Sequence, residues 1–196
     1  MRHWAIWLLA AALAGCAVTP PMVPLPVPAD VARFQDWTAS GRMALAVDGG
    51  GGSGSFTWQQ NGVFTTLSIR GPFGAGGLRV VADDQSMQVT DGSGRTVDTD
   101  QAREALRVQL GADLPWTHLR YWMLGVPSPG EPAQVADARA APMRVIEQSG
   151  WRIGYDTFRP VPGSALPERF TATHGTVRLK VVIDDWTVAS GAPARP

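Results

Sequence analysis

Apolar side chains recur at every second position along most of the chain. Leu67 and Ile69, for example, alternate with Ser68 and Arg70. The same alternation marks the segments 43–47, 56–59, 63–70, 78–82, 87–90, 143–145, 151–155, 169–173 and 177–186. Because neighbouring side chains of a strand point to opposite faces, a period of two indicates strands with one buried face. The pattern predicts one mostly antiparallel and strongly curved β-sheet.

Turn signals separate the predicted strands. Asn61-Gly62 is typical of a tight hairpin in which both central residues adopt a positive φ, and Asp91-Gly92 and Ser149-Gly150 give similar signals. The glycine run 49–54 lacks the lysine of a phosphate-binding loop and joins two predicted strands, so it is interpreted as a flexible hairpin loop. A proline-rich loop is expected over 160–167.

Three segments follow a helical spacing instead. Apolar residues three positions apart predict a short helix over 30–37. Longer helices are predicted over 99–110 and 115–124, and the second begins with a proline, whose missing N–H costs no hydrogen bond in a first turn. Because these two consecutive helices interrupt a series of strands, we expect them to form a lid across one opening of the curved sheet.

The N-terminal residues have the pattern of a signal peptide. A basic start precedes an apolar run over 4–14 that is shorter than the roughly 20 residues a spanning helix needs. The run ends at Leu13-Ala14-Gly15-Cys16, which resembles the lipobox of bacterial lipoproteins. The alternative is a buried cysteine in an ordinary apolar segment. We expect 1–15 to be removed and Cys16 to carry a covalent diacylglycerol and an N-acyl chain, with no other cofactor.

The rest of the chain divides into a tether, one domain and a tail. Five prolines between positions 20 and 28 favour an extended polyproline II segment, so 16–29 is predicted to be a stiff tether that holds the domain off the bilayer. Residues 30–189 have a length suited to a single β domain. The tail 190–196 is expected to be loose.

Composition narrows the possible functions. The only cysteine is Cys16, so no disulfide framework is available and the fold depends on its core, for which 44% hydrophobic residues suffice. The formal net charge is +0, so no basic excess points to nucleic acid. We expect a monomer that does not bind nucleic acid.

The sequence contains no recognisable catalytic or metal-binding motif. No serine lies in a G-x-S-x-G elbow, and His118 and His174 are expected at the surface, without a third ligand that would complete a metal site. The adjacent pairs Asp83-Asp84 and Asp184-Asp185 lie near predicted strand ends, where neighbouring side chains diverge. Binding rather than catalysis is therefore predicted.

Two features suggest what is bound. Large apolar residues are abundant and either fill a solid core or line an apolar cavity between sheet and lid. The candidates for such a lining are Trp58, Leu67, Trp122, Met123, Trp151 and Trp186. The second feature is Phe73, which Pro72 and Gly74 place at the tip of a glycine-rich loop. It either folds back on the sheet or stays exposed as a binding device, here a membrane-insertion loop.

Several motifs together resemble the LolB family of outer-membrane lipoproteins. They occur in family order over nearly the whole mature chain. They are GRM at 41–43, FTWQQ at 56–60, GPFG at 71–74, LGADLP at 110–115, LRYWMLGVP at 119–127, GWRIGY at 150–155 and a final strand that ends at Trp186. The helical segment and the ordered set are the specific part of the resemblance.

The resemblance implies an unclosed β-barrel whose helices cap an apolar cavity. It implies an anchored outer-membrane receptor that takes acylated lipoproteins from a periplasmic carrier of the LolA type, without an energy source, and inserts them among outer-membrane phospholipids. The loop residue that the family needs for delivery, often leucine, corresponds to Phe73, and Ala17 after the lipidated cysteine fits release to the outer membrane. Two alternatives stay open: a lipid-anchored periplasmic hydrolase, and a structural scaffold lipoprotein.

Overall fold

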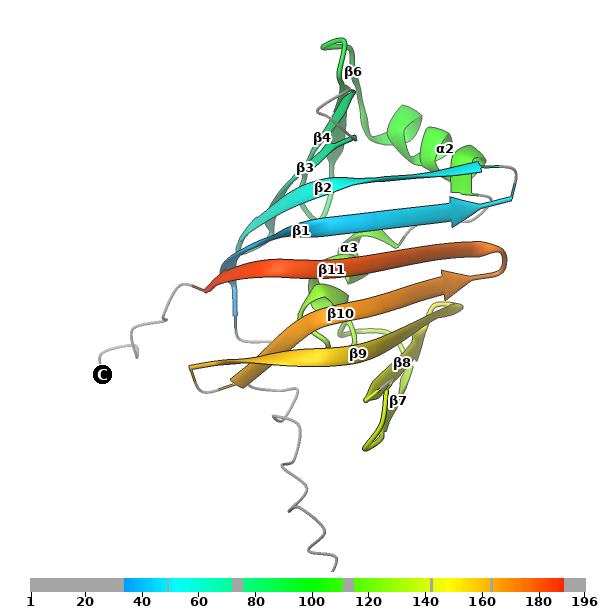
Figure 1. Cartoon of the computed structure of the whole chain (residues 1–196). Coiled ribbons are helices and arrows are strands. Elements are labelled where there is room, and N and C mark those ends of the chain that lie inside the picture. The colour runs from blue at the N-terminus through cyan, green and yellow to red at the C-terminus, as the bar shows by residue number, and fades with distance from the viewer. Residues whose placement is uncertain are drawn as a thin grey trace, which may run out of the picture.

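The fold is one antiparallel β-sheet of 11 strands that curves around a hollow without closing (Figure 1). The computed structural model describes residues 34–48, 50–71, 76–110, 115–141, 143–162 and 164–188. The strands of the first half are β1 (Asp36–Val47), β2 (Gly50–Asn61), β3 (Phe64–Arg70), β4 (Gly77–Ala82), β5 (Met87–Asp91) and β6 (Thr96–Val97). Those of the second half are β7 (Ala133–Asp137), β8 (Arg144–Gln148), β9 (Trp151–Val161), β10 (Ser164–His174) and β11 (Val177–Val188).

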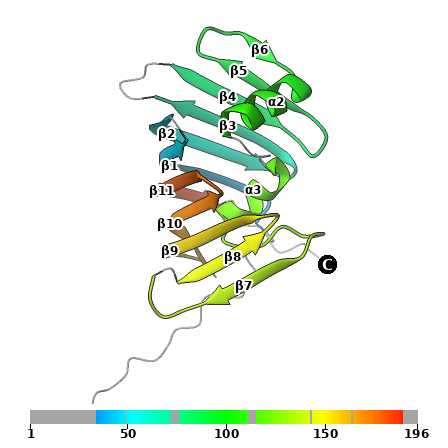
Figure 2. The ribbon, with the colours of Figure 1, turned by 90° about the vertical axis from the view of Figure 1, so that its right-hand side faces the viewer.

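The first and last strands pair in the middle of the sheet. The order is β6-β5-β4-β3-β2-β1-β11-β10-β9-β8-β7, and Trp37 of β1 lies opposite Val188 of β11. Each half of the chain therefore forms one wing of hairpins, and the wings end at the edge strands β6 and β7 (Figure 2). The predicted antiparallel, unclosed sheet is confirmed.

Alternation decides which face of each strand is buried. In β11, Val177, Val181 and Ile183 are buried, whereas Arg178 and Lys180 are exposed. In β9, Trp151, Ile153 and Tyr155 are buried in the same way. The hollow side is lined by Val177 and Val181 of β11 and by Trp151 and Ile153 of β9, so apolar surface removed from water stabilises the curvature of the sheet.

A close backbone contact accompanies an irregularity in the central pair. The register between β1 and β11 shifts at Ser40/Gly41. A Cβ at position 41 would lie 2.1 Å from the carbonyl oxygen of Val182, so only glycine fits there. Such a bulge bends a strand and increases its twist, which helps the sheet to curl.

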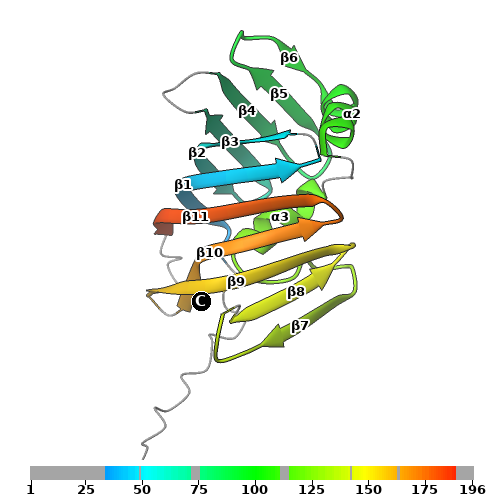
Figure 3. The same cartoon turned by 45° about the vertical axis from the view of Figure 1, so that its right-hand side comes forward.

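Two helices lie between β6 and β7 in the sequence. They are α2 (Thr99–Leu110) and α3 (Trp116–Met123), close to the predicted bounds. Helix α2 lies beside β5, and α3 lies in the hollow of the sheet, against its concave face (Figure 3). No helix in the described ranges has both the length and the apolar character needed to cross a bilayer.

The helix predicted over 30–37 is wrong where it can be checked. Asp36 and Trp37 begin β1, Phe34 and Gln35 belong to neither a helix nor a strand, and 30–33 lies outside the described residues. Trp37 pairs with Gln60 on one side and Val188 on the other. Ladder hydrogen bonds and burial of the indole therefore outweigh the local spacing of three.

Two predicted loops are also shorter than expected. Most of the glycine run belongs to β2, because a ladder with β1 needs backbone groups and no side chains. Residue 49 lies outside the described part. The proline-rich segment is mostly strand, since β9 extends to Val161 and β10 begins at Ser164, with Pro160 opposite Ala165. Pairing with β9 continues past Pro167, where the register shifts.

The first hairpin turn is displaced by one residue. Asn61 pairs with Phe64 and still belongs to β2, so the two turn residues are Gly62 and Val63. Gly62 has φ +59°, a conformation that favours glycine, whereas no positive φ occurs at Asn61 or Val63. The other predicted turn at Ser149 and Gly150 is confirmed, and both of its residues have a positive φ.

Candidate functional site

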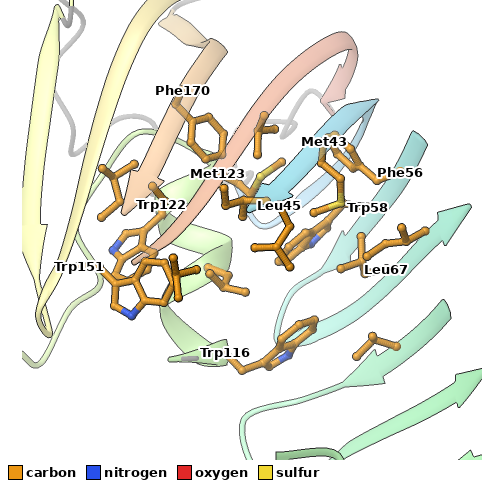
Figure 4. A pocket seen from close by; sticks show the side chains of 18 of the residues that line it. Met43, Leu45, Phe56, Trp58, Leu67, Trp116, Trp122, Met123, Trp151 and Phe170 are labelled. Carbon is orange, nitrogen blue, oxygen red and sulfur yellow. The ribbon is translucent and has the colours of Figure 1, made fainter. Parts of the chain in front are cut away.

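An apolar cavity of about 250 Å³ lies between the concave face of the sheet and α3 (Figure 4). Strands from both wings and from the centre contribute to its wall, and α3 covers it. All of the side chains that line it are apolar, including Met43, Leu45, Leu179 and Trp116. A space with such a wall suits hydrocarbon better than water, because a water molecule needs polar partners.

The wall contains most of the side chains proposed from the sequence. Trp58, Leu67, Trp122, Met123 and Trp151 line the cavity. Trp186 does not, which corrects the expectation for that residue. Its ring packs edge-on against Trp37 with centroids 5.3 Å apart, and its Nε1 donates a 2.8 Å hydrogen bond to the carbonyl of Pro167. These contacts fix Trp186 outside the wall.

The indole N–H of Trp58 is satisfied behind the wall. It donates to Oε1 of the buried Gln60 over 3.0 Å, and the hydroxyl of Thr65 donates to the same oxygen over 2.7 Å. The amide nitrogen of Gln60 donates to the carbonyl of Gly62 over 2.9 Å. The polar end of this ring therefore does not reach the cavity, where an unpaired donor would be costly.

A second buried glutamine does the same for Trp122. Oε1 of Gln148 accepts hydrogen bonds from Trp122 Nε1 (3.0 Å) and from the backbone N–H of Ser128 (2.9 Å), while its amide nitrogen donates to the carbonyl of Ser128 (2.8 Å). Sequence reasoning missed both glutamines. The signal that could have identified them is their position in the strand, because the alternation of buried and exposed side chains in β2 and β8 puts both glutamines on the buried face.

Further hydrogen bonds hold the C-terminal end of α3 to the sheet. The Tyr155 hydroxyl donates to the carbonyl of Trp122 over 2.8 Å, and Nη1 of the buried Arg144 donates to the carbonyl of Gly125 over 3.1 Å. Asp137 pairs with Arg144 over 2.7 Å. Burial raises the pKa of the Tyr155 phenol well above its ordinary range, so the hydroxyl remains a donor.

The N-terminal end of α3 is held differently. Trp116 stacks on Trp58 with centroids 5.8 Å apart and an interplanar angle of 10°. His118, which follows two residues later, is also buried. In the last turn of the helix, Arg120 forms an ion pair of 3.1 Å with the half-exposed Asp84. Exposed ion pairs contribute little. Helix α3 is therefore held to the sheet by hydrogen bonds at its C-terminal end, and by the ring contact of Trp116 and the buried His118 at its N-terminal end.

The two histidines are less exposed than expected. His118 is buried, its ring packs against Trp122, and its Nδ1 lies 3.3 Å from the hydroxyl of Ser149. That hydroxyl also donates to the carboxylate of Glu131. His174 is half-buried against Trp151. Both imidazole rings pack against indole rings, and these contacts explain why the two histidines are less exposed than the sequence predicted.

Several predicted site residues cannot be placed. Cys16 and the loop residues Pro72, Phe73 and Gly74 lie outside the described residues. The neighbouring strands show only that this loop joins β3 to β4. Within the described ranges, no group of three or more His, Cys, Asp or Glu side chains could hold a metal ion.

Solved structures with the same fold have very different sequences. A LolA-superfamily protein from Nitrosomonas europaea matches with a TM-score of 0.52 at 8% identity, over 81% of this chain and 88% of that one. A DUF1329-family protein from Desulfovibrio piger also has a TM-score of 0.52 at 8% identity, over 84% and 90%. At this identity the likeness shows the fold alone.

Sequence comparison is more specific. The family model described as outer membrane lipoprotein LolB matches residues 35–186. A protein from Halorhodospira halophila, named outer-membrane lipoprotein LolB, is 34% identical over 157 residues, which cover 80% of this chain and 77% of the relative. A protein of the same name from a Marinomonas species is 28% identical over 188 residues, covering 95% and 98%. The chain belongs to the LolB family of outer-membrane lipoproteins.

Proposed function

We propose that this chain is a lipoprotein receptor, anchored in the outer membrane through lipid on Cys16 and facing the periplasm. It accepts the acyl chains of lipoproteins from a carrier of the LolA type in the cavity under α3, and releases them into the inner leaflet of the outer membrane. The observation that carries the proposal is the uniformly apolar wall of that cavity. Membership of the LolB family supports the same role.

The free energy of acyl-chain hydration explains why such a cavity is needed. Three chains of about 15 methylenes, at ~0.8 kcal/mol each, amount to roughly 35 kcal/mol of unfavourable water exposure. A receptor without an energy source must therefore exchange apolar contact for apolar contact. Dispersion and hydrophobic contacts are non-directional, so a wall of indole, leucine and methionine side chains accepts acyl chains whatever protein they belong to.

The size of the cavity implies that the lid moves. A dry cavity of about 150 Å³ holds one benzene molecule, so 250 Å³ has room for roughly ten carbons, which is part of one acyl chain. Helix α3 must therefore shift before a lipoprotein can enter. The stack of Trp116 on Trp58 is a contact that such a shift would break, whereas Tyr155 and Arg144 hold the C-terminal end of the helix.

The loop between β3 and β4 supplies orientation rather than driving force. Burial of one phenylalanine in lipid contributes only about 1.5–3 kcal/mol, which is far below the cost of exposing the acyl chains. Insertion of Phe73 into the bilayer would nevertheless keep the receptor in a fixed orientation while the acyl chains are released. The lipid on Cys16 keeps it at the membrane, since more than one acyl chain is needed for stable anchoring.

A reconstituted transfer reaction tests this function. A carrier loaded with an acylated lipoprotein is mixed with vesicles that contain the receptor, and lipoprotein in the vesicle fraction is measured without nucleotide. We expect transfer that depends on the receptor. A receptor that leaves the lipoprotein on its carrier contradicts the proposal, and release of free fatty acid in the same reaction would favour the hydrolase alternative.

A further inference from the structure

A polar pocket of about 460 Å³ lies on the outer face of the sheet, away from the apolar cavity. Four neighbouring strands form it, namely β11, β1, β2 and β3. Arg42 of β1 lies opposite Ser55 of β2, and Ser55 lies opposite Arg70 of β3, so the two arginines flank a serine with their Cα atoms about 10 Å apart. In the adjacent row, Thr57 lies opposite Ser68, and both also line the pocket.

The pocket carries one excess positive charge. Arg42 donates to both carboxylate oxygens of Asp184, over 3.2 and 2.9 Å. These hydrogen bonds lower the pKa of Asp184, so its carboxylate stays ionised. Arg70 forms no ion pair with any residue in the described ranges. Two arginines and one aspartate at the pocket leave +1 (2 − 1 = +1), which matches the single negative charge of a phosphodiester.

Hydroxyl groups complete the chemistry that a phosphodiester needs. The hydroxyls of Ser55, Thr57 and Ser68 make no hydrogen bond with other described residues, and they surround the space beside Arg70. Phosphate oxygens accept hydrogen bonds from hydroxyls and form strong, charge-assisted bonds with guanidinium groups. Water alone would satisfy the guanidinium group of Arg70. Hydration, however, does not require three hydroxyl donors on the same side of the pocket.

We propose that this pocket binds the phosphodiester of a phospholipid headgroup. The inference rests on the proposed function, because Arg70 is the last residue of β3 and the chain next enters the loop that is expected to touch the bilayer. Headgroups around the base of that loop would lie within reach of the pocket. Binding of a headgroup in the pocket would fix the rotation of the barrel on the membrane. The apolar cavity would then keep a constant orientation relative to the bilayer.

Vesicle binding tests the pocket with a matched control. The mature chain from position 16, with Cys16→Ala to remove the anchor, is floated with vesicles of phosphatidylethanolamine and phosphatidylglycerol. Arg79→Gln is the control for Arg70→Gln, because Arg79 is exposed on the outer face of β4, opposite Ser68, and does not line the pocket. We expect Arg70→Gln to weaken binding about five- to tenfold, and Arg79→Gln less than about twofold. Equal losses, or no loss, overturn the proposal.

A second measurement separates the sources of phosphate. Glycerophosphoethanolamine and inorganic phosphate are titrated separately into the same protein, and the amide NMR signals of Ser55, Ser68 and Arg70 are followed. We expect saturable shifts with the headgroup at lower concentration than with phosphate. Equal affinity for both, or no shift with either, overturns a headgroup site. Uptake of an acyl probe by the cavity should be unchanged in Arg70→Gln. If wild-type protein binds the headgroup but takes up no probe, the proposed function fails while the pocket stands.

Discussion

The indole Nε1 of Trp122 donates a hydrogen bond to Oε1 of Gln148 over 3.0 Å and so joins the lid helix α3 to strand β8. The same glutamine is bound on both sides by the backbone of Ser128, in the segment that follows α3. One buried side chain therefore positions the end of the helix and the chain that leaves it. The cavity wall at Trp122 depends on this contact.

Replacement of Gln148 should destabilise the protein more than replacement of an exposed glutamine. Gln148→Leu leaves the Trp122 indole and the Ser128 N–H without their partner in a buried place, which costs about 1–3 kcal/mol for each such group. Gln88→Leu on the exposed side of β5 is the control. Urea denaturation measures the free energy of unfolding. Equal stability of the two variants would show that the glutamine does not hold the lid.

Stability at alkaline pH should depend on Tyr155. An unfolded tyrosine loses its proton near pH 10, whereas burial raises the pKa of Tyr155 in the folded state. Its contribution to stability is therefore fully present below about pH 10 and decreases above it, by about 1.4 kcal/mol per pH unit. We expect Tyr155→Phe to lack this part of the slope when unfolding is measured from pH 9 to 11. If the free energy of unfolding falls with pH equally steeply in the wild-type protein and in Tyr155→Phe, this account is contradicted.

Filling the cavity should block acyl-chain binding without unfolding the sheet. Leu179 lines the cavity and is only half-buried, so Leu179→Trp extends into the free space. Val182→Trp is the control, because Val182 does not line the cavity and lies on the outer face of the same strand. We expect at least a tenfold weaker affinity for an acylated peptide in Leu179→Trp, and little change in the control. Equal affinity would mean that acyl chains bind elsewhere.

The loop between β3 and β4 should be needed for the delivery of lipoproteins to the membrane and not for their uptake by the receptor. Phe73→Glu places a charge where contact with lipid is expected, so lipoproteins should enter the receptor and fail to reach the vesicles. Phe64→Glu is a matched control, because Phe64 is an exposed phenylalanine in the β2–β3 hairpin at the other end of β3. Normal delivery by Phe73→Glu in the reconstituted reaction removes the membrane role of this loop.

The fold was predictable from the sequence because its signals are local. Alternation of apolar and polar residues marked most strands, and a change to helical spacing marked α2 and α3. Short elements such as β6, Thr96–Val97, carry too few residues for a periodic pattern. The turn at Gly62-Val63 and the strand start at Asp36 depend on pairing partners distant in sequence, which no local pattern contains.

The site was predictable in part for the same reason. Residues at inward positions of strands next to the lid, such as Trp58 and Trp151, line the cavity as their register requires. Trp186 has the same sequence signature, but a hydrogen bond to the Pro167 carbonyl holds it outside the wall. The roles of Gln60 and Gln148 depend on indole groups that only the folded chain brings to them.

Quenching of tryptophan emission by brominated acyl chains tests the central claim most directly. Trp58, Trp116, Trp122 and Trp151 all line the cavity, so bromine atoms that enter it must lie against their rings. We predict saturable quenching by a peptide with a brominated acyl chain, none by the unacylated peptide, and strongly reduced quenching in Leu179→Trp. Absence of quenching, or quenching that Leu179→Trp leaves undiminished, would contradict an acyl-chain site under α3.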